Sequence, residues 1–218
     1  MAFRIKKSCL AIVILAASLP AQPLSFTARK HTLTVDEAGV TLDRRHWTYT
    51  DIRRLTLAPD RLTVLTYEDS KWRPGRERTY SVDHLPDGAA AKLYPLFRAH
   101  MDQRFIAEMV EPGIQPLWQV PAKRERGWDG GPNGTLIVGA DRIVFDSAER
   151  DASRTWRYTD IANVSHSGLF DLSLNTQLGA EVRFTLKQPL PEDRFQALWL
   201  RLEELNGLTP YRARLSQH

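Results

Sequence analysis

The chain has 218 residues, of which 42% are hydrophobic and 26% charged, a composition that excludes a disordered polymer and allows one or two globular domains. Its 30 basic and 26 acidic residues give a net charge of +4, but three of the basic residues lie in the first 21 positions, which hold no acidic residue. The remaining chain carries +1, so we expect no nucleic-acid partner and no strong attraction to anionic lipid.

The N-terminus has the layout of a secretory signal peptide, with three basic residues among the first seven and then an uncharged apolar run over residues 9–19. We expect cleavage after Ala21 and a secreted or periplasmic protein. A membrane anchor that stays uncleaved, or a buried helix, is the alternative. Cys9 is the only cysteine, so the mature protein would contain no disulfide and no thiolate for a metal or a reaction.

Short strands dominate the chain that follows. Alternating polar and apolar residues predict one hairpin over residues 31–43 and a second over residues 134–146, in which the same apolar positions recur 103 residues later. Further short strands follow each hairpin, at residues 55–57, 61–67 and 79–82 in the first copy and at residues 169–174 and 180–186 in the second. The recurrence indicates that the chain contains two copies of one small module.

A motif of six residues, Trp-x-Tyr-Thr-Asp-Ile, follows each hairpin and defines the repeat. Its residues are Trp47, Tyr49, Asp51 and Ile52 in the first copy, and Trp156, Tyr158, Asp160 and Ile161 in the second. Residues two apart share one face of a strand, so the tryptophan and tyrosine are expected to cover the core. The aspartate is expected to fix a turn by accepting backbone N–H bonds, and a ligand-contacting role is the alternative.

Each copy ends in a helical pattern. Apolar residues recur at steps of three and four over residues 89–101 and 195–205, each run preceded by a proline and an acidic residue. Each module is therefore expected to contain six to seven short antiparallel strands followed by one amphipathic helix. The fold class that we predict is mainly β with α (α+β).

This order of elements, with Tyr49-Thr-Asp51-Ile52 and Tyr158-Thr-Asp160-Ile161, resembles the pleckstrin-homology-like superfold, and specifically bacterial PH and GRAM-like domains. The resemblance covers residues 26–105 and 125–208, and it implies that each module is a small antiparallel barrel or a two-sheet sandwich capped by its C-terminal helix. The predicted organisation is a signal peptide (1–21), module 1 (26–105), a linker (106–133), module 2 (134–208) and a tail (209–218).

The linker is rich in proline and glycine, which predicts an irregular connection. It also carries Trp118 and Trp128, which a bare linker does not normally hold. We therefore expect the connection to pack against one or both modules.

The sequence contains no catalytic motif of the G-x-S-x-G, phosphate-binding glycine loop or H-E-x-x-H type. The six histidines are scattered, and no two of them are four residues apart. We predict no catalytic residues, no metal and no cofactor, with a metal site assembled from distant residues as the alternative.

In the family that the chain resembles, binders of lipid headgroups carry several basic residues in the loop between the first two strands. Here these loops, Asp36–Gly39 and Gly139–Arg142, are acidic or nearly neutral. The best candidate for a contact surface is instead a basic loop with one aromatic residue, a combination common at interface anchors. Its residues are Lys71, Trp72, Arg73, Arg76 and Arg78, and solvated loop charge is the alternative.

We predict from these features a non-enzymatic, exported binding protein that recognises an unidentified protein or peptide in the cell envelope. An exposed sheet edge beside the helix would accept an extended peptide as an added strand. Association with a membrane surface is the alternative. An enzyme with its site between the modules is a third hypothesis, which a pocket joining titratable residues of both copies would favour. The oligomeric state stays open.

Overall fold

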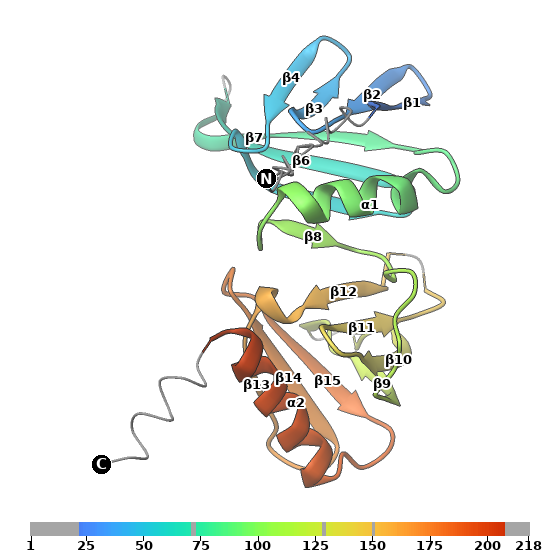
Figure 1. Cartoon of the computed structure of the whole chain (residues 1–218), viewed down its shortest axis with the longest axis vertical. Coiled ribbons are helices and arrows are strands. Elements are labelled where there is room, and N and C mark those ends of the chain that lie inside the picture. Colours follow the sequence, from blue (N-terminus) through green and yellow to red (C-terminus); the bar gives the residue numbers. More distant parts are fainter. Residues whose placement is uncertain (1–21, 71–72, 128–129, 150, 208–218) are drawn as a thin grey trace, which may run out of the picture.

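The computed structural model describes residues 22–70, 73–127, 130–149 and 151–207. The predicted signal peptide and tail lie outside these residues, as do Lys71, Trp72 and Trp128. The described chain is mainly β with two helices (Figure 1), which confirms the fold class at that level. Neither helix of the described residues is long and apolar enough to cross a membrane.

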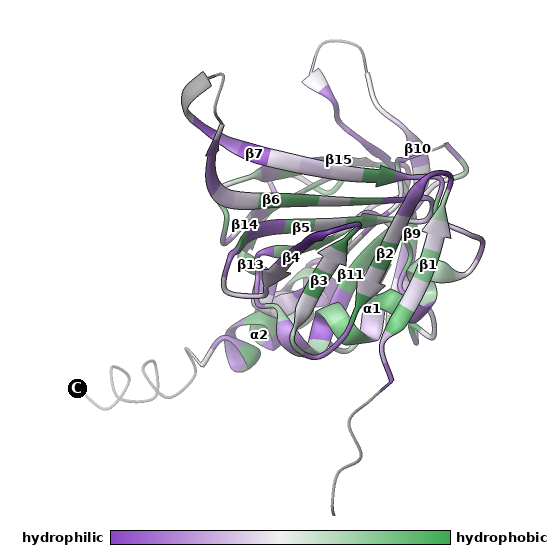
Figure 2. Cartoon of the chain, turned by 90° about the horizontal axis from the view of Figure 1, so that it is seen from above, coloured by the Kyte–Doolittle hydropathy of each residue, from purple (hydrophilic) through white to green (hydrophobic). Residues whose placement is uncertain are grey.

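The N-terminal half, residues 24–109, begins with two hairpins and ends with a helix and a short linking strand. Its elements are β1 (Leu24–Ala28), β2 (His31–Val35), β3 (Gly39–Leu42), β4 (Arg45–Thr48), β5 (Ile52–Ala58), β6 (Arg61–Ser70), β7 (Arg73–Asp83), α1 (Ala89–His100) and β8 (Phe105–Ala107). The strands β1 to β4 cross over β5, β6 and β7 at a steep angle (Figure 2), which encloses apolar side chains between the two layers.

The C-terminal half, residues 118–205, repeats this order of elements. It comprises β9 (Trp118–Arg124), β10 (Asn133–Val138), β11 (Arg142–Asp146), β12 (Arg154–Arg157), the 3-10 turn η2 (Tyr158–Asp160), β13 (Ile161–Ser165), β14 (Asp171–Thr176), β15 (Glu181–Leu186) and α2 (Glu192–Leu205). In each half, strands in meander order precede one helix.

Strand pairing places the two halves in one continuous sheet. In the described chain, β1-β2-β3-β4 form a four-stranded sheet, and the others form an eleven-stranded sheet in the order β13-β14-β15-β9-β10-β11-β12-β8-β5-β6-β7. The strand β8 joins the halves, because it runs parallel to β5 and pairs with β12 through Ala107 and Thr155. Both sheets have open edges, so the described residues contain no closed barrel.

Each half buries its own hydrophobic core. One cluster of buried residues runs from Ala28 to Met109 and the other from Val120 to Leu202. The helix α1 packs on β1, β5 and β8, and α2 packs on β13 and η2. Burial of apolar surface contributes about 25 cal/mol per Å², so each half contributes a core of its own to the stability of the chain.

The motif residues occupy matching places in the two cores. Trp47, Tyr49 and Ile52 are buried in the first, and their counterparts Trp156, Tyr158 and Ile161 in the second. The Tyr49 hydroxyl donates to the carbonyl oxygen of Asp36, and the Tyr158 hydroxyl donates to that of Gly139, both at 2.7 Å. Each tyrosine thus fastens the turn of the hairpin that precedes it. An irregularity in register follows each motif isoleucine as well.

The aspartates of the motif fix the turn that leads into the next strand. Oδ2 of Asp51 accepts the backbone N–H of Thr48 at 3.0 Å and its hydroxyl at 2.6 Å. Asp160 accepts the backbone N–H of Arg157 at 3.1 Å, and its Nε and Nη2 at 2.9 and 2.8 Å. By accepting these hydrogen bonds the two aspartates fix their turns, as the sequence predicts.

The two halves differ at one corner of the sheet. In the C-terminal half, β9 continues past its hairpin partner and pairs with β15, where Ala122 lies opposite Leu186. In the N-terminal half, β1 ends at Ala28, which matches Ala122, and a tight turn leads straight into β2. The strands β1 and β7 are therefore not joined, and the corner stays open.

The connection between the halves corrects one expectation. The predicted linker, residues 106–133, is not irregular throughout, because it contains most of β8 and all of β9. Proline counts against a strand in sequence, but Pro121 lies within β9, opposite Thr135 of β10, and its carbonyl oxygen accepts the backbone N–H of Lys187 at 2.8 Å. Trp118 packs against the core of the C-terminal half.

Candidate functional site at the junction of the two halves

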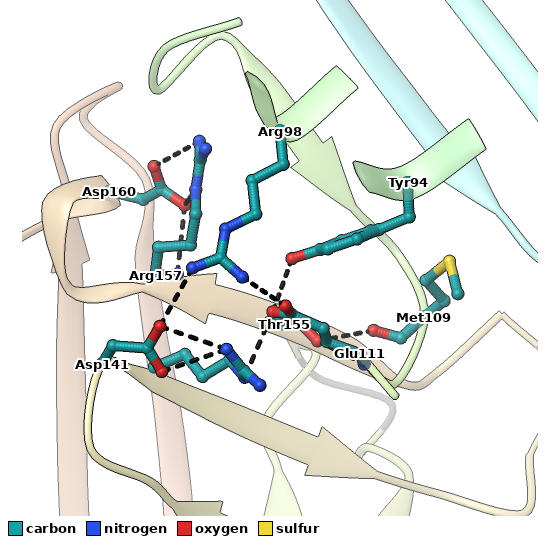
Figure 3. A network of polar contacts seen from close by, with 9 residues as sticks. Tyr94, Arg98, Met109, Glu111, Asp141, Thr155, Arg157 and Asp160 are labelled. Carbon is teal, nitrogen blue, oxygen red and sulfur yellow. Dashed lines mark hydrogen bonds and ion pairs between the residues drawn. The ribbon is translucent and has the colours of Figure 1, made fainter. Parts of the chain in front are cut away.

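A buried carboxylate ties the two halves together (Figure 3). Glu111, which follows β8 and is 5% exposed, accepts hydrogen bonds from the Tyr94 hydroxyl at 2.6 Å and from Nη1 of Arg98 at 2.5 Å, both on α1. Nε of Arg142 on β11 lies 3.2 Å from the same carboxylate. Burial, and then the contact with Glu111, raises the pKa of Tyr94, so its hydroxyl stays protonated and donates.

Further polar contacts surround this carboxylate. Nη2 of Arg98 donates to Asp141 at 3.0 Å, and Nη1 of Arg142 donates to both oxygens of the same aspartate. On the other side, Nη2 of Arg157 donates to the carbonyl oxygen of Asp102 at 2.8 Å. Because a buried charge is costly unless its partners are in place, these contacts hold the halves in one arrangement.

A pocket of about 270 Å³ lies at the same junction, between β5 and β8 on one side and β12 and the β14–β15 turn on the other. Its lining includes charged residues of both halves, Arg54 and Glu108 with Arg154 and Asp160, and apolar side chains such as Phe105, Trp156 and Leu178. A smaller pocket of about 210 Å³ shares Glu108, Arg154 and Trp156 with it. The pocket thus has walls from both halves.

Two nitrogen atoms of the pocket-lining residues are buried without a partner. Nε of Arg154 and Nε1 of Trp156 have no hydrogen-bond acceptor among the described residues. Trp156 is 2% exposed, and the guanidinium carbon of Arg154 lies 5.2 Å from the centre of its ring. A buried donor left without an acceptor costs about 1–3 kcal/mol. The lining therefore holds hydrogen-bonding capacity that the described residues do not use.

Charged side chains of both signs surround these donors. Burial lowers the pKa of Arg154, which the nearby carboxylates of Glu108 and Asp160 partly offset. Burial and neighbouring arginines lower the pKa of Arg124 to about 10. Both side chains stay cationic at neutral pH, and Arg54 adds an exposed third charge. Of the two carboxylates, Asp160 is already bound to Arg157 through both oxygens.

In the N-terminal half, the N–H of the matching tryptophan has a hydrogen-bond acceptor within the chain. Nε1 of Trp47 donates to Oε1 of Glu68 at 3.0 Å. Oε2 of that carboxylate accepts the Tyr80 hydroxyl at 3.1 Å and pairs with Nη1 of Arg78 at 3.4 Å. The hydrogen bond from Trp47 lowers the pKa of Glu68, and Tyr80 and Arg78 lower it further. Glu68 thus completes the polar surroundings of its tryptophan.

Sequence spacing indicates which residue of the C-terminal half corresponds to this carboxylate. The motif isoleucines pair with Thr66 of β6 and Thr176 of β14. Two positions further on are Glu68, which is still in β6, and Leu178, which lies in the turn after β14. By the same register, Val182 of β15 stands where β7 has Tyr80. The C-terminal half keeps the tryptophan but has apolar residues in place of the carboxylate and the hydroxyl.

The predicted basic surface is only partly described. The backbone of Arg73 pairs with that of Ser70 at the end of the β6–β7 hairpin. Arg76 is exposed, whereas Arg78 is bound to Glu68. The described part of this surface therefore offers Arg76 to a partner and uses Arg78 inside the chain.

The sequence analysis did not single out Arg154, Leu178, Glu108 or Glu111. A position-by-position comparison of the two copies contains a signal for the first two, because Arg-x-Trp-x-Tyr occurs in both whereas Glu68 has no acidic counterpart. Glu108 and Glu111 lie in the connection, which has no second copy for comparison. Among the described residues, no group of three or more His, Cys, Asp or Glu side chains is placed to hold a metal ion.

Comparison with known proteins gives weak likenesses. No family model matches the chain, and neither does any curated protein sequence. Among solved structures, the C-terminal domain of an unknown protein from Leishmania infantum is 18% identical, with a TM-score of 0.35, over 41% of this chain and 85% of that one. The Spt16D Pob3N heterodimer is 14% identical, with a TM-score of 0.31, over 78% of this chain and 99% of the matched one. Scores this low do not define a shared fold.

Proposed function

We propose that the protein is an exported, non-enzymatic binding protein, made of two tandem pleckstrin-homology-like modules, that recognises a segment of a protein or peptide in the cell envelope. The repeated order of strands and helix in the two halves supports the tandem arrangement. The repeated Tyr-Thr-Asp-Ile sequence supports the family, and the basic start with its apolar run supports export.

One observation carries the assignment of a binding role. The junction pocket is lined by Arg154 and Trp156, whose buried Nε and Nε1 have no acceptor among the described residues. Native proteins pair nearly all buried polar groups, so an unpaired donor calls for an explanation. A ligand that brings hydrogen-bond acceptors into the pocket supplies the missing partners.

An enzyme with its site at the junction is the second candidate, because the pocket joins Arg54 and Glu108 of the N-terminal half with Arg154 of the C-terminal half. Guanidinium groups orient anions in many active sites, and a carboxylate can act as a base. We favour binding because the unpaired donors need only an acceptor, whereas a reaction would also need a reacting group that these residues do not specify.

The test is peptide selection followed by site-directed loss of binding. Peptides from a random displayed library are selected on the purified chain and measured by fluorescence anisotropy. The variant Arg154→Met removes the buried guanidinium at similar length. Arg194→Met, at an exposed position on α2, is the matched control. We expect Arg154→Met to weaken binding at least about tenfold, or about 1.4 kcal/mol, and Arg194→Met to leave it unchanged.

Selected peptides that bind the two variants equally well would contradict the junction site. A chain that selects no peptide but binds vesicles of phosphatidylglycerol, with affinity that falls as salt rises, would favour the membrane-surface alternative instead.

A further inference from the structure

We infer that the junction pocket binds the carboxylate of an acidic residue in the partner peptide, in the place that the Glu68 side chain holds beside Trp47. The inference rests on the proposed function, since it takes the ligand to be a peptide. It goes further by naming the group that is recognised and the residues that recognise it, which are Arg54, Arg154 and Trp156.

The N-terminal half provides the template within the same chain. There a glutamate oxygen accepts the indole N–H of Trp47 at 3.0 Å, and the second oxygen faces the Arg78 guanidinium. Arg45, two residues before this tryptophan, lies over the ring of Tyr80 at 5.0 Å. One carboxylate among an indole and two arginines is thus an arrangement that this fold already builds.

The C-terminal half keeps the tryptophan and the arginine two residues before it, but it lacks the carboxylate and has Val182 in place of Tyr80. Arg154 precedes Trp156 by two residues, as Arg45 precedes Trp47. By sequence spacing the counterpart of Glu68 is Leu178, which is 40% exposed on a turn at the pocket. Nε1 of Trp156 and Nε of Arg154 are shielded from solvent and have no acceptor among the described residues, so a carboxylate reaches them when neighbouring side chains such as Leu178 move aside.

The junction also buries the arginine more deeply than the template does. Arg45 is exposed, whereas Arg154 is partly buried in a pocket that residues of the N-terminal half also line. Charge-assisted hydrogen bonds to a carboxylate are about twice as strong as neutral ones, and low local polarity strengthens them. The second copy is therefore the better of the two places to bind a carboxylate from another molecule.

The pocket has the size and lining that an acidic side chain needs. Its volume of about 270 Å³ exceeds the roughly 150 Å³ that five water-sized groups fill at about 30 Å³ each, and a glutamate side chain has five non-hydrogen atoms. Phe105, Ile106 and Leu178 offer apolar surface for the methylene groups.

The balance of charge also favours an anion. In the pocket itself Arg54 and Arg154 face the carboxylates of Glu108 and Asp160. Asp160 is bound to Arg157 through both oxygens, which leaves Glu108 as the acidic counterpart of two arginines. An added carboxylate thus gives each arginine of the pocket an acidic partner and leaves no excess of negative charge.

The experiment observes the indole N–H of Trp156 directly, by NMR of the 15N-labelled chain, with its resonance assigned from Trp156→Phe. Two capped pentapeptides, Ala-Ala-Glu-Ala-Ala and Ala-Ala-Gln-Ala-Ala, form a matched pair with and without the charge. Free glutarate and inorganic phosphate are the small-anion arms. We expect the glutamate peptide to move the Trp156 indole resonance, the glutamine peptide to do so at least tenfold more weakly, and glutarate and phosphate to bind at least tenfold more weakly than the glutamate peptide.

Two variants at one position provide a test that does not depend on the choice of peptide. Leu178→Glu places the missing carboxylate where Glu68 stands in the other half, and Leu178→Gln is the matched neutral control. We expect the Trp156 resonance of Leu178→Glu to lie at the ligand-bound position without any peptide. The variant should no longer respond to the glutamate peptide, whereas Leu178→Gln should still respond.

The outcomes separate this inference from the proposed function. Equal responses to the glutamate and glutamine peptides would overturn the carboxylate while leaving a peptide-binding pocket. Glutarate or phosphate binding as tightly as the peptide would overturn the peptide as its source. Peptides from the library that bind without moving the Trp156 resonance would overturn this pocket as the place of binding, and a failure of the library to yield any binder would overturn the proposed function.

Discussion

The two halves share a scaffold and differ in how its polar surroundings are completed. In the N-terminal half, Glu68 occupies the site beside Trp47, so the indole N–H is paired within the chain. In the C-terminal half, Leu178 corresponds to Glu68 and Val182 to Tyr80, and the indole N–H of Trp156 has no acceptor among the described residues. Two exchanges of polar for apolar side chains thus separate the surroundings of the two tryptophans, and our proposal places a ligand at the second.

A second difference lies at the corner of each sheet. The pairing of β9 with β15 closes the corner in the C-terminal half. In the N-terminal half the corresponding corner is open, and a pocket of about 570 Å³ lies there among residues of the β1–β2 turn and the end of β7, including Arg29, His31 and His84. The half that closes this corner is the half in which the buried tryptophan N–H has no acceptor among the described residues.

The largest effect is expected from breaking the contact that joins the halves. Glu111→Gln removes the buried charge that Arg98 and Arg142 face, and loss of one partner from a buried ion pair costs about 3 kcal/mol. Urea unfolding at neutral pH measures the change. The exposed Glu37→Gln is the control, expected to lie within about 0.5 kcal/mol of the wild type. A loss no larger than that of the control would show that the halves are held by the β8 pairing alone.

An effect of intermediate size on stability is expected from a substitution that makes the N-terminal half resemble the C-terminal half. Glu68→Leu leaves the buried N–H of Trp47 without its acceptor, at a cost of about 1.5 kcal/mol, measured by urea unfolding. Because the folded state lowers the pKa of Glu68, its contribution is present above the ordinary value of 4.5 and is lost as pH falls through the lower folded value.

The difference between the wild type and Glu68→Leu should therefore narrow below about pH 4. Glu68→Gln keeps an acceptor but carries no titrating group, so the stability difference between it and Glu68→Leu should not change with pH. A difference between the wild type and Glu68→Leu that widens in acid would contradict the assignment of Glu68 as the charged partner.

The smallest effects test the part of the scaffold that the halves share. Tyr49→Phe and Tyr158→Phe each remove one hydrogen bond of 2.7 Å to a hairpin carbonyl, which is worth about 1 kcal/mol. Burial raises the pKa of Tyr49 to about 12 and raises that of Tyr158 too, so both hydroxyls donate at neutral pH. Thermal unfolding of the two variants should give similar losses, and a loss in one half alone would contradict the equivalence of the two tyrosines.

The scaffold follows from local signals, which is why much of it can be predicted from the sequence. The alternation around Leu33 and Leu136 predicts the hairpins, and the steps of three and four after residues 88 and 191 predict the helices. The strand β9 could not be predicted, because Pro121 within it is a signal against a strand and its pairing with β15 joins segments about 60 residues apart.

The junction was out of reach of the sequence for a different reason. No local sequence pattern marks Arg154 as a site residue. It lines the pocket because β8 brings Phe105 and Glu108 to the same place, and the placement of β8 depends on its parallel pairing with β5. Glu111 has no periodic pattern around it, and its partners come from α1 and β11. Long-range contacts of this kind have no local signature.

The most direct test of the central claim, that the polar site of the C-terminal half lacks one carboxylate, is the stability of Leu178→Glu against Leu178→Gln. The two variants differ in charge and hardly in shape, so the comparison isolates the contact with Trp156 and Arg154. We predict that urea unfolding at neutral pH finds Leu178→Glu more stable by about 1 kcal/mol, and that the gap closes when Arg154→Met is added to both. Equal stability of the two variants, or a less stable Leu178→Glu, would contradict the account.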